Sequence, residues 1–192
     1  MNWNRMSRIA VGGLLILLSG CGGGSSTQPN PTPTPTPPGP WTFPASSKFA
    51  VTLYADSSTY AIGDSFDVKV VAYNLTNVFG ATFQVNYPAS QLNVGRVVYN
   101  STPIVTPNLE LPGRVEADSN RVSFGFTFLR GSHHAFNGSA VLARLRCLGT
   151  AAGTAKFTLA RANLAIQDST GSAIPNFSNL EVDSLSVTVH TH

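Results

Sequence analysis

Charge and cysteine are both scarce in this chain of 192 residues. Asp, Glu, Lys and Arg together make up 11% of it, and its two cysteines are Cys21 and Cys147. Two of its 12 Lys and Arg residues, Arg5 and Arg8, lie in the first twenty residues, which leaves ten against nine Asp and Glu in the remainder. Because that remainder is nearly neutral and has no basic patch with interleaved aromatics, nucleic acid is not expected as a partner.

Recognisable catalytic and metal-binding motifs are also missing. No G-x-S-x-G sequence marks an activated serine, and there is no D-x-D-x-D-G loop of the EF-hand type. His133 and His134 are adjacent in an expected loop, and neighbouring residues rarely ligate one metal together. Glu116 and Asp118 lie at the end of an expected hairpin, where a role in the turn is enough to explain them. We therefore predict no catalytic residue, no metal site and no cofactor in this chain, and we expect that it is not an enzyme.

The first twenty residues have the organisation of a bacterial lipoprotein signal peptide. Two arginines form a positive region, residues 9–18 are apolar, and Leu18-Ser19-Gly20-Cys21 resembles a lipobox. The apolar run is too short to indicate a membrane span. The resemblance implies cleavage before Cys21, a diacylglyceryl thioether on its sulfur and acylation of its amino group. An ordinary secretory signal with an incidental cysteine is the alternative.

Residues 21–47 are predicted to be a linker. Residues 22–40 read GGGSSTQPNPTPTPTPPGP, in which the Gly/Ser part is flexible and the Thr-Pro repeat favours polyproline II. At about 3.1 Å per residue, residues 29–40 would span roughly 37 Å. We therefore expect a domain over residues 48–192 that stands away from a lipid-anchored end at the cell envelope, on the outer membrane in a cell with two membranes. A disordered tether without a geometric role is the alternative.

Short alternating apolar stretches, separated by turn signals, recur along residues 48–192. Val122, Phe124, Phe126 and Phe128 alternate strictly and predict a strand with one buried face. Since about nine such stretches occur and no sustained helical pattern does, we predict an all-β fold, an antiparallel jelly-roll β-sandwich. The expected strands are residues 49–54, 65–74, 78–87, 92–99, 114–117, 121–128, 142–148, 154–159 and 185–189.

Three further expectations concern loops, edges and the second cysteine. Residues 100–113 contain three prolines and are expected to form a loop. Lys69, Arg144 and Arg146 point outward in the predicted strands and are expected to protect sheet edges. Cys147 is expected to be a small buried hydrophobic residue, although a disulfide with Cys21 is possible in principle.

Motifs spread along the β region resemble those of cohesin domains, the receptor modules of cellulosomal scaffolds. Gly80-Ala-Thr-Phe-Gln-Val-Asn-Tyr-Pro is similar to the family's G-x-x-F-x-L-x-Y strand, and Leu92 fits the start of the next strand. Further positions that match the family are the Gly63-Asp64 turn, Val122-Ser-Phe-Gly-Phe, Gly138 followed by Leu142-Ala-Arg-Leu-Arg-Cys, and Asp168-Ser-Thr-Gly-Ser-Ala-Ile.

The resemblance implies a nine-stranded sandwich that binds a dockerin through one sheet face. A dockerin is a small calcium-loaded helical module on another protein, so the calcium would belong to the partner. In type I cohesins the polar contacts come from the strand that matches residues 80–87 and from the region after the strand that ends here at Phe128. At these places this chain has Gly80, Thr82 and Phe128, where type I cohesins often have acidic and amide side chains. The candidate partner-binding residues are Gly80, Thr82, Gln84, Asn86 and Phe128.

The predicted function is an envelope-anchored binding module, cohesin-like, for a dockerin-bearing or other protein partner. A carbohydrate-binding module for polysaccharide is the alternative, because such modules share the sandwich architecture and the fold alone does not separate the two. Binders of flat polysaccharide present a row of exposed aromatics. Trp41 is the only tryptophan outside the leader and lies beside the linker, and Tyr54, Tyr73 and Tyr99 form no evident strip. A structural envelope lipoprotein without a specific partner is a third interpretation.

Overall fold

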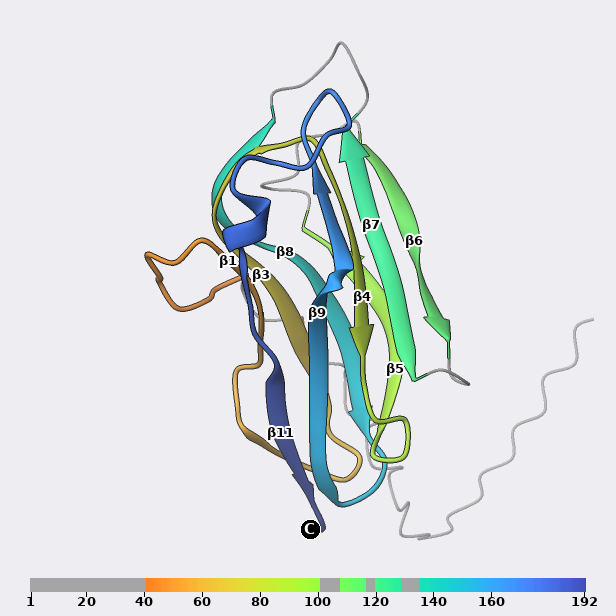
Figure 1. Ribbon diagram of the computed structural model, residues 1–192. Helices are drawn as coiled ribbons and strands as arrows, with labels where there is room; N and C mark the ends of the chain where they lie inside the picture. The colour runs from red at the N-terminus through yellow and green to blue at the C-terminus, as the bar shows by residue number, and fades with distance from the viewer. Residues whose placement is uncertain (1–40, 101–107, 117–119, 129–134) are drawn as a thin grey trace, which may run out of the picture. The chain divides into compact units, whose positions relative to one another are not determined.

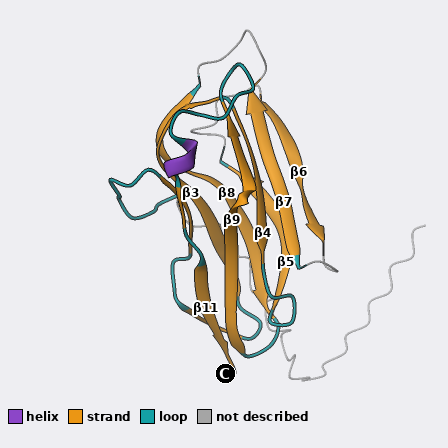
Figure 2. Ribbon diagram, viewed as in Figure 1, coloured by secondary structure: helices purple, strands orange, loops and turns teal. Residues whose placement is uncertain are grey.

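The computed structural model describes residues 41–100, 108–116, 120–128 and 135–192. Regular structure in these ranges consists of β-strands and one short 3₁₀ turn at Phe177–Asn179, as Figure 2 shows. Within them no helix is long and apolar enough to cross a membrane. The strands are β1 (Ala50–Tyr54), β2 (Thr59–Ala61), β3 (Ser65–Val78), β4 (Gly80–Asn86), β5 (Leu92–Tyr99), β6 (Asn108–Glu116), β7 (Arg121–Phe128), β8 (Phe136–Gly149), β9 (Gly153–Gln167), β10 (Glu181–Val182) and β11 (Leu185–His190).

These strands form two sheets that pack face to face (Figure 1). The five-stranded sheet has the order β10-β1-β3-β8-β5, and the six-stranded sheet has the order β2-β11-β9-β4-β7-β6. Neighbouring strands run antiparallel, apart from the parallel pairs β1–β10 and β2–β11. The predicted all-β sandwich is therefore confirmed, and the structure adds the short edge strands β2 and β10.

Strict alternation along the strands places one face of each sheet in a shared core. Phe83 on β4 and Phe124 on β7 stack with their ring centroids 5.1 Å apart, and Phe157 on β9 is completely buried. The predicted buried face of β7 is confirmed, because its alternating valine and phenylalanines all belong to this core. The core draws on strands from β1 to β11, and residues 39–192 form one compact unit.

Residues 41–48, most of which the sequence predicts to be linker, cover the outer face of the five-stranded sheet over β3 and β8. Lys69 lies on β3, and Arg144 and Arg146 lie on β8. Both strands are central in the sheet, so the expectation that these residues protect edges is wrong. Lys69 is 2% exposed and Arg144 is 6% exposed, because residues 41–48 lie over them.

Part of the expected loop over residues 100–113 is strand. β6 begins at Asn108 and pairs with β7 along its length, with a register shift between Leu111 and Arg114. Pro112 lies at this shift, and β6 is an edge strand, where a missing backbone N–H is tolerated. The expectation of a loop is therefore wrong for residues 108–113, and residues 101–107 lie outside the described ranges.

Replacing Phe83 by alanine tests which face of β4 is buried. The change removes a fully buried ring that stacks on Phe124, and we expect it to lower the free energy of unfolding by about 3–5 kcal/mol. The adjacent Thr82→Val variant changes an outward side chain and should stay within about 0.5 kcal/mol of the parent. Urea denaturation of both variants measures the difference, and equal losses would contradict the assigned faces.

Candidate functional site

The outer face of β9, β4, β7 and β6 carries rows of side chains that the strand register aligns. Thr82 on β4 lies between Ala165 on β9 and Gly125 on β7, and Leu111 on β6 completes this row. The next row contains Gln84, which pairs with Ser123, and Ser123 in turn pairs with Arg114. Most of these side chains are small or neutral, so the face is only mildly polar.

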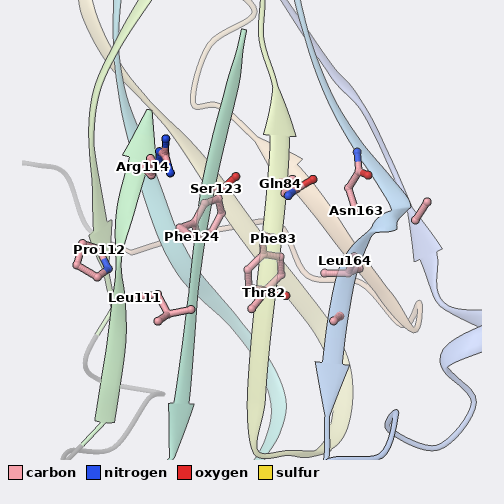
Figure 3. Close-up of a pocket in the computed structure, with 12 residues that line it drawn as sticks. Thr82, Phe83, Gln84, Leu111, Pro112, Arg114, Ser123, Phe124, Asn163 and Leu164 are labelled. Atoms are coloured by element: carbon pink, nitrogen blue, oxygen red, sulfur yellow. The ribbon is translucent and has the colours of Figure 1, made fainter. Parts of the chain in front are cut away.

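An open groove of about 370 Å³ crosses this face. Figure 3 shows Arg114, Ser123, Gln84 and Asn163 in one line across it, with Leu111 and Thr82 in a second line. Gly125, which pairs with Thr82, has no room for a side chain, because a Cβ there would lie 2.5 Å from the carbonyl oxygen of Ala81. At this position β4 and β7 therefore approach each other too closely for any residue but glycine on β7.

A bulge in β9 forms one wall of the groove. Phe83 and Val85 are two residues apart on β4, but they pair with Leu164 and Leu159, which are five residues apart on β9. Three extra residues of β9 are thus accommodated here, and a bulge of this kind redirects side chains at the edge of a site. Arg161 holds the bulge in place, because its guanidinium donates to the carbonyl oxygens of Ser178 (2.6 Å) and Leu180.

Tyr99 of β5, a strand of the opposite sheet, supports the other wall. Its hydroxyl accepts a hydrogen bond from the Gly125 N–H at 2.9 Å and donates one to the carbonyl oxygen of Leu111. A phenol hydroxyl thus connects β7 to β6 beside the register shift at Pro112. Burial raises the pKa of Tyr99 to about 12, so the hydroxyl stays protonated and can donate at neutral pH.

Charge gathers at one end of the groove. Arg114 is the only charged residue among the described residues that line it. Glu116 lies one row beyond and accepts hydrogen bonds from Arg121 at 2.5 and 3.0 Å, whereas its oxygen is 3.7 Å from Arg114 Nε. The Arg114 side chain is 80% exposed, so the weak pair with Glu116 leaves it available to another molecule.

Comparison with known proteins rests on the fold. No family model matches the chain, and no curated protein matches its sequence. Among solved structures, a non-cellulosomal cohesin from Archaeoglobus fulgidus superposes with a TM-score of 0.58 and 18% identity, over 75% of this chain and 92% of that one. A cohesin module from a family 33 glycoside hydrolase of Clostridium perfringens gives a TM-score of 0.60 and 12% identity, over 77% of this chain and 100% of that one. A cohesin from Acetivibrio cellulolyticus, in complex with a dockerin, superposes with a TM-score of 0.61 and 13% identity, over 73% of this chain and 99% of that one.

The chain has a cohesin-like fold. The predicted resemblance is thereby confirmed at the level of the fold. At these identities the likeness carries the arrangement of strands and not the identity of a partner.

The cohesin-like sandwich brings only some of the predicted site residues together. Thr82 and Gln84 line the groove, and Asn86 is exposed on the same face beside Arg121. Gly80 lies at the opposite end of β4, where it is buried and a Cβ would lie 3.1 Å from Thr127 Oγ1.

Phe128, the last of the candidate partner-binding residues, is a core residue on the buried face of β7 that its alternation predicts. It is 3% exposed and packs edge-on against Phe79 and Phe126. The remaining prediction, lipidation of Cys21, falls outside the described residues. Cys147 is free and buried, and burial raises the pKa of its thiol, as expected for a residue with a packing role.

The β6 side of the groove is not predicted from the sequence. Leu109 and Leu111 are 53% and 43% exposed, and Leu111, Pro112 and Arg114 line the groove. The alternation Leu109-Glu110-Leu111 was a signal for a strand, but the prolines around it favoured a loop. Within the described ranges, no three His, Cys, Asp or Glu side chains lie close enough together to hold a metal ion.

Replacing Tyr99 by phenylalanine tests whether its hydroxyl supports the groove. The change leaves the Gly125 N–H and the Leu111 carbonyl without this partner, so we expect a loss of about 1–3 kcal/mol in the free energy of unfolding. Amide hydrogen exchange at Gly125 should also become faster. Tyr60→Phe is the matched control, since it removes a hydroxyl that accepts from the Ser57 N–H at an exposed turn.

Tyr99→Phe should also change how the free energy of unfolding depends on pH. Tyr99 is held protonated in the fold, with a pKa of about 12, whereas the unfolded value is about 10. Its contribution to the free energy of unfolding is therefore complete below about pH 10 and is lost as the pH rises toward 12. From pH 9 to 11 the stability of the parent should fall more steeply than that of Tyr99→Phe, and parallel curves would contradict the buried phenol.

Proposed function

We propose that residues 41–192 form a non-catalytic protein-binding module that docks a dockerin-type partner on the groove face of β9, β4, β7 and β6. The observation that carries the proposal is the groove itself, which is open, is lined by uncharged residues apart from Arg114, and has exposed Leu109 and Leu111 at its β6 edge. Exposed apolar side chains gathered at a groove that polar residues line are typical of a protein interaction site. Any calcium in such a complex would be bound by the dockerin.

The fold supports the same partner class. Several cohesins that share this fold were solved together with dockerins. The groove here differs in its residues, because it presents Thr82, Gln84, Ser123 and Asn163 around an apolar rim. Selection of one dockerin over another would therefore depend on the shape of the groove and on Arg114 at its end.

A polysaccharide ligand receives less support. The large hydrophobic side chains that the described ranges expose are Leu109, Leu111 and Leu148, none of them aromatic. Trp41 is partly buried against the guanidinium of Arg144 and does not lie flat toward solvent. A row of exposed aromatic rings for a flat sugar chain is thus absent from the described surface.

We also propose that the module is anchored at the cell envelope through a lipid on Cys21. The lipobox and the Pro-rich linker of residues 22–40 support this location. Replacing Cys21 by serine should move the protein from the membrane fraction to the soluble fraction, measured by immunoblot after fractionation. Unchanged membrane association would contradict a lipid anchor at this residue.

Binding to purified dockerins tests the function. We expect residues 41–192 to bind at least one member of a panel of calcium-loaded type I and type II dockerins, and to lose binding when EDTA unfolds the dockerin. Combining Thr82→Arg with Gln84→Arg should raise the dissociation constant at least tenfold, because two long charged side chains would fill the uncharged part of the groove.

Asn93→Arg is the control, since Asn93 is exposed on β5 of the other sheet. Isothermal titration calorimetry measures all three proteins. Equal binding by the groove variant would exclude this face, and retention on insoluble cellulose or chitin without dockerin binding would favour the sugar ligand.

A further inference from the structure

Residues 41–48 contact β3 through the carbonyl oxygens of every second residue. The Lys69 ammonium donates to the Thr42 carbonyl at 3.0 Å, and the Tyr73 hydroxyl donates to the Pro44 carbonyl at 2.8 Å. One further donor, the Asn74 side-chain amide, reaches the carbonyl oxygens of both Ser46 and Lys48, at 3.1 and 2.7 Å. Side chains of one strand thus bind the backbone of a segment that joins no sheet.

Two aromatic side chains of the segment fix its position on the sheet. The Trp41 ring lies 3.6 Å from the Arg144 guanidinium, a cation–π contact. The Phe43 ring meets the Tyr73 ring edge-on, with centroids 5.7 Å apart. Together with Val71 and Val141 these rings form a small apolar cluster that is separate from the main core.

The charges beneath the segment are built into the fold. Lys69 is 2% exposed, and its ammonium lies 2.7 Å from Asp56 and 5.5 Å from the centre of the Tyr54 ring. On β8, Arg144 and Arg146 share the carboxylate of Asp67 at 3.3 and 3.0 Å. A buried ammonium needs a full set of acceptors, and the Thr42 carbonyl supplies one of them.

We propose that the outer face of β3 and β8 is a peptide-binding face whose occupant is residues 41–48 of the same chain, bound as a detachable strap. Recognition divides into two parts. The donors on β3 bind backbone carbonyls, which any sequence offers, and the cluster under Trp41 and Phe43 selects the aromatic side chains. This resembles the recognition of an external peptide, in which main-chain hydrogen bonds give affinity and pockets give specificity.

The strap determines where the N-terminal segment joins the domain. It lies on the five-stranded sheet, whereas the groove lies on the outer face of the six-stranded sheet. A load transmitted through the preceding residues would reach β3 and β8 first. The strap would detach before the core strands are disturbed, because side-chain contacts and not a strand ladder hold it.

A peptide added to the full chain tests the proposal. Replacing Trp41 and Phe43 together by alanine should open the strap, and the double variant should then bind a fluorescent synthetic peptide with the sequence of residues 41–48, WTFPASSK. The parent chain should bind this peptide at least tenfold more weakly, because its own strap acts at an effective concentration of about millimolar or higher. Fluorescence anisotropy measures the affinities, and NMR shifts of Lys69 and Tyr73 locate the peptide.

The matched control is the double substitution Thr42→Ala and Ser47→Ala, which alters two exposed side chains and keeps every carbonyl. It should behave as the parent does. Equal peptide binding by all three proteins would overturn the proposal. Absence of peptide binding by the double variant, when rapid amide exchange shows that its strap is open, would overturn it as well. A dimer of the parent that the peptide dissociates would also overturn it, since the occupant would then come from a second copy. If the double variant fails to fold by circular dichroism, Phe43→Ala alone takes its place.

Discussion

Alternation of side chains across two packed sheets is the constraint on which the rest of this structure depends. Because successive residues of a strand point to opposite faces, burying Phe83 and Val85 in the core fixes Thr82 and Gln84 on the outside of the six-stranded sheet. On β3 the same rule sends Val68 and Val70 inward and Lys69 outward. Two outer faces result, of which one is covered by residues 41–48 and the other carries an open groove.

The sequence was sufficient for those parts of the fold that local alternation determines. The buried face of β7 could be predicted because a few neighbouring residues encode it, and the turn at Asp168, where the family motif matches, is equally local. The Asp168 carboxylate, for example, accepts hydrogen bonds from the N–H groups of Thr170 and Ser172. Strand order, by contrast, is not local. Lys69 was expected near an edge, and only the pairing of β3 with both β1 and β8 shows that it is central.

The candidate site shows the same division. The cohesin resemblance points to the strand over residues 80–87, and alternation with core residues places Thr82 and Gln84 on its outer face. Leu111 and Pro112 were missed, since the proline content suggested a loop and the tolerance of an edge strand for proline depends on a neighbour that the sequence does not reveal. Tyr99 was considered only as a possible exposed aromatic, because its contact with Gly125 crosses from one sheet to the other.

The two outer faces also differ in how they would bind a polypeptide. The strap face uses buried charges, whose removal from water is costly unless every partner is present, so it suits a segment that the same chain supplies at a high effective concentration. The groove face presents neutral side chains and one exposed arginine, Arg114. A partner that binds this face would gain little from electrostatic steering, so its association would be slow to moderate and would depend weakly on salt. Discrimination between partners on this face would then come from the fit against Leu111 and the β9 bulge.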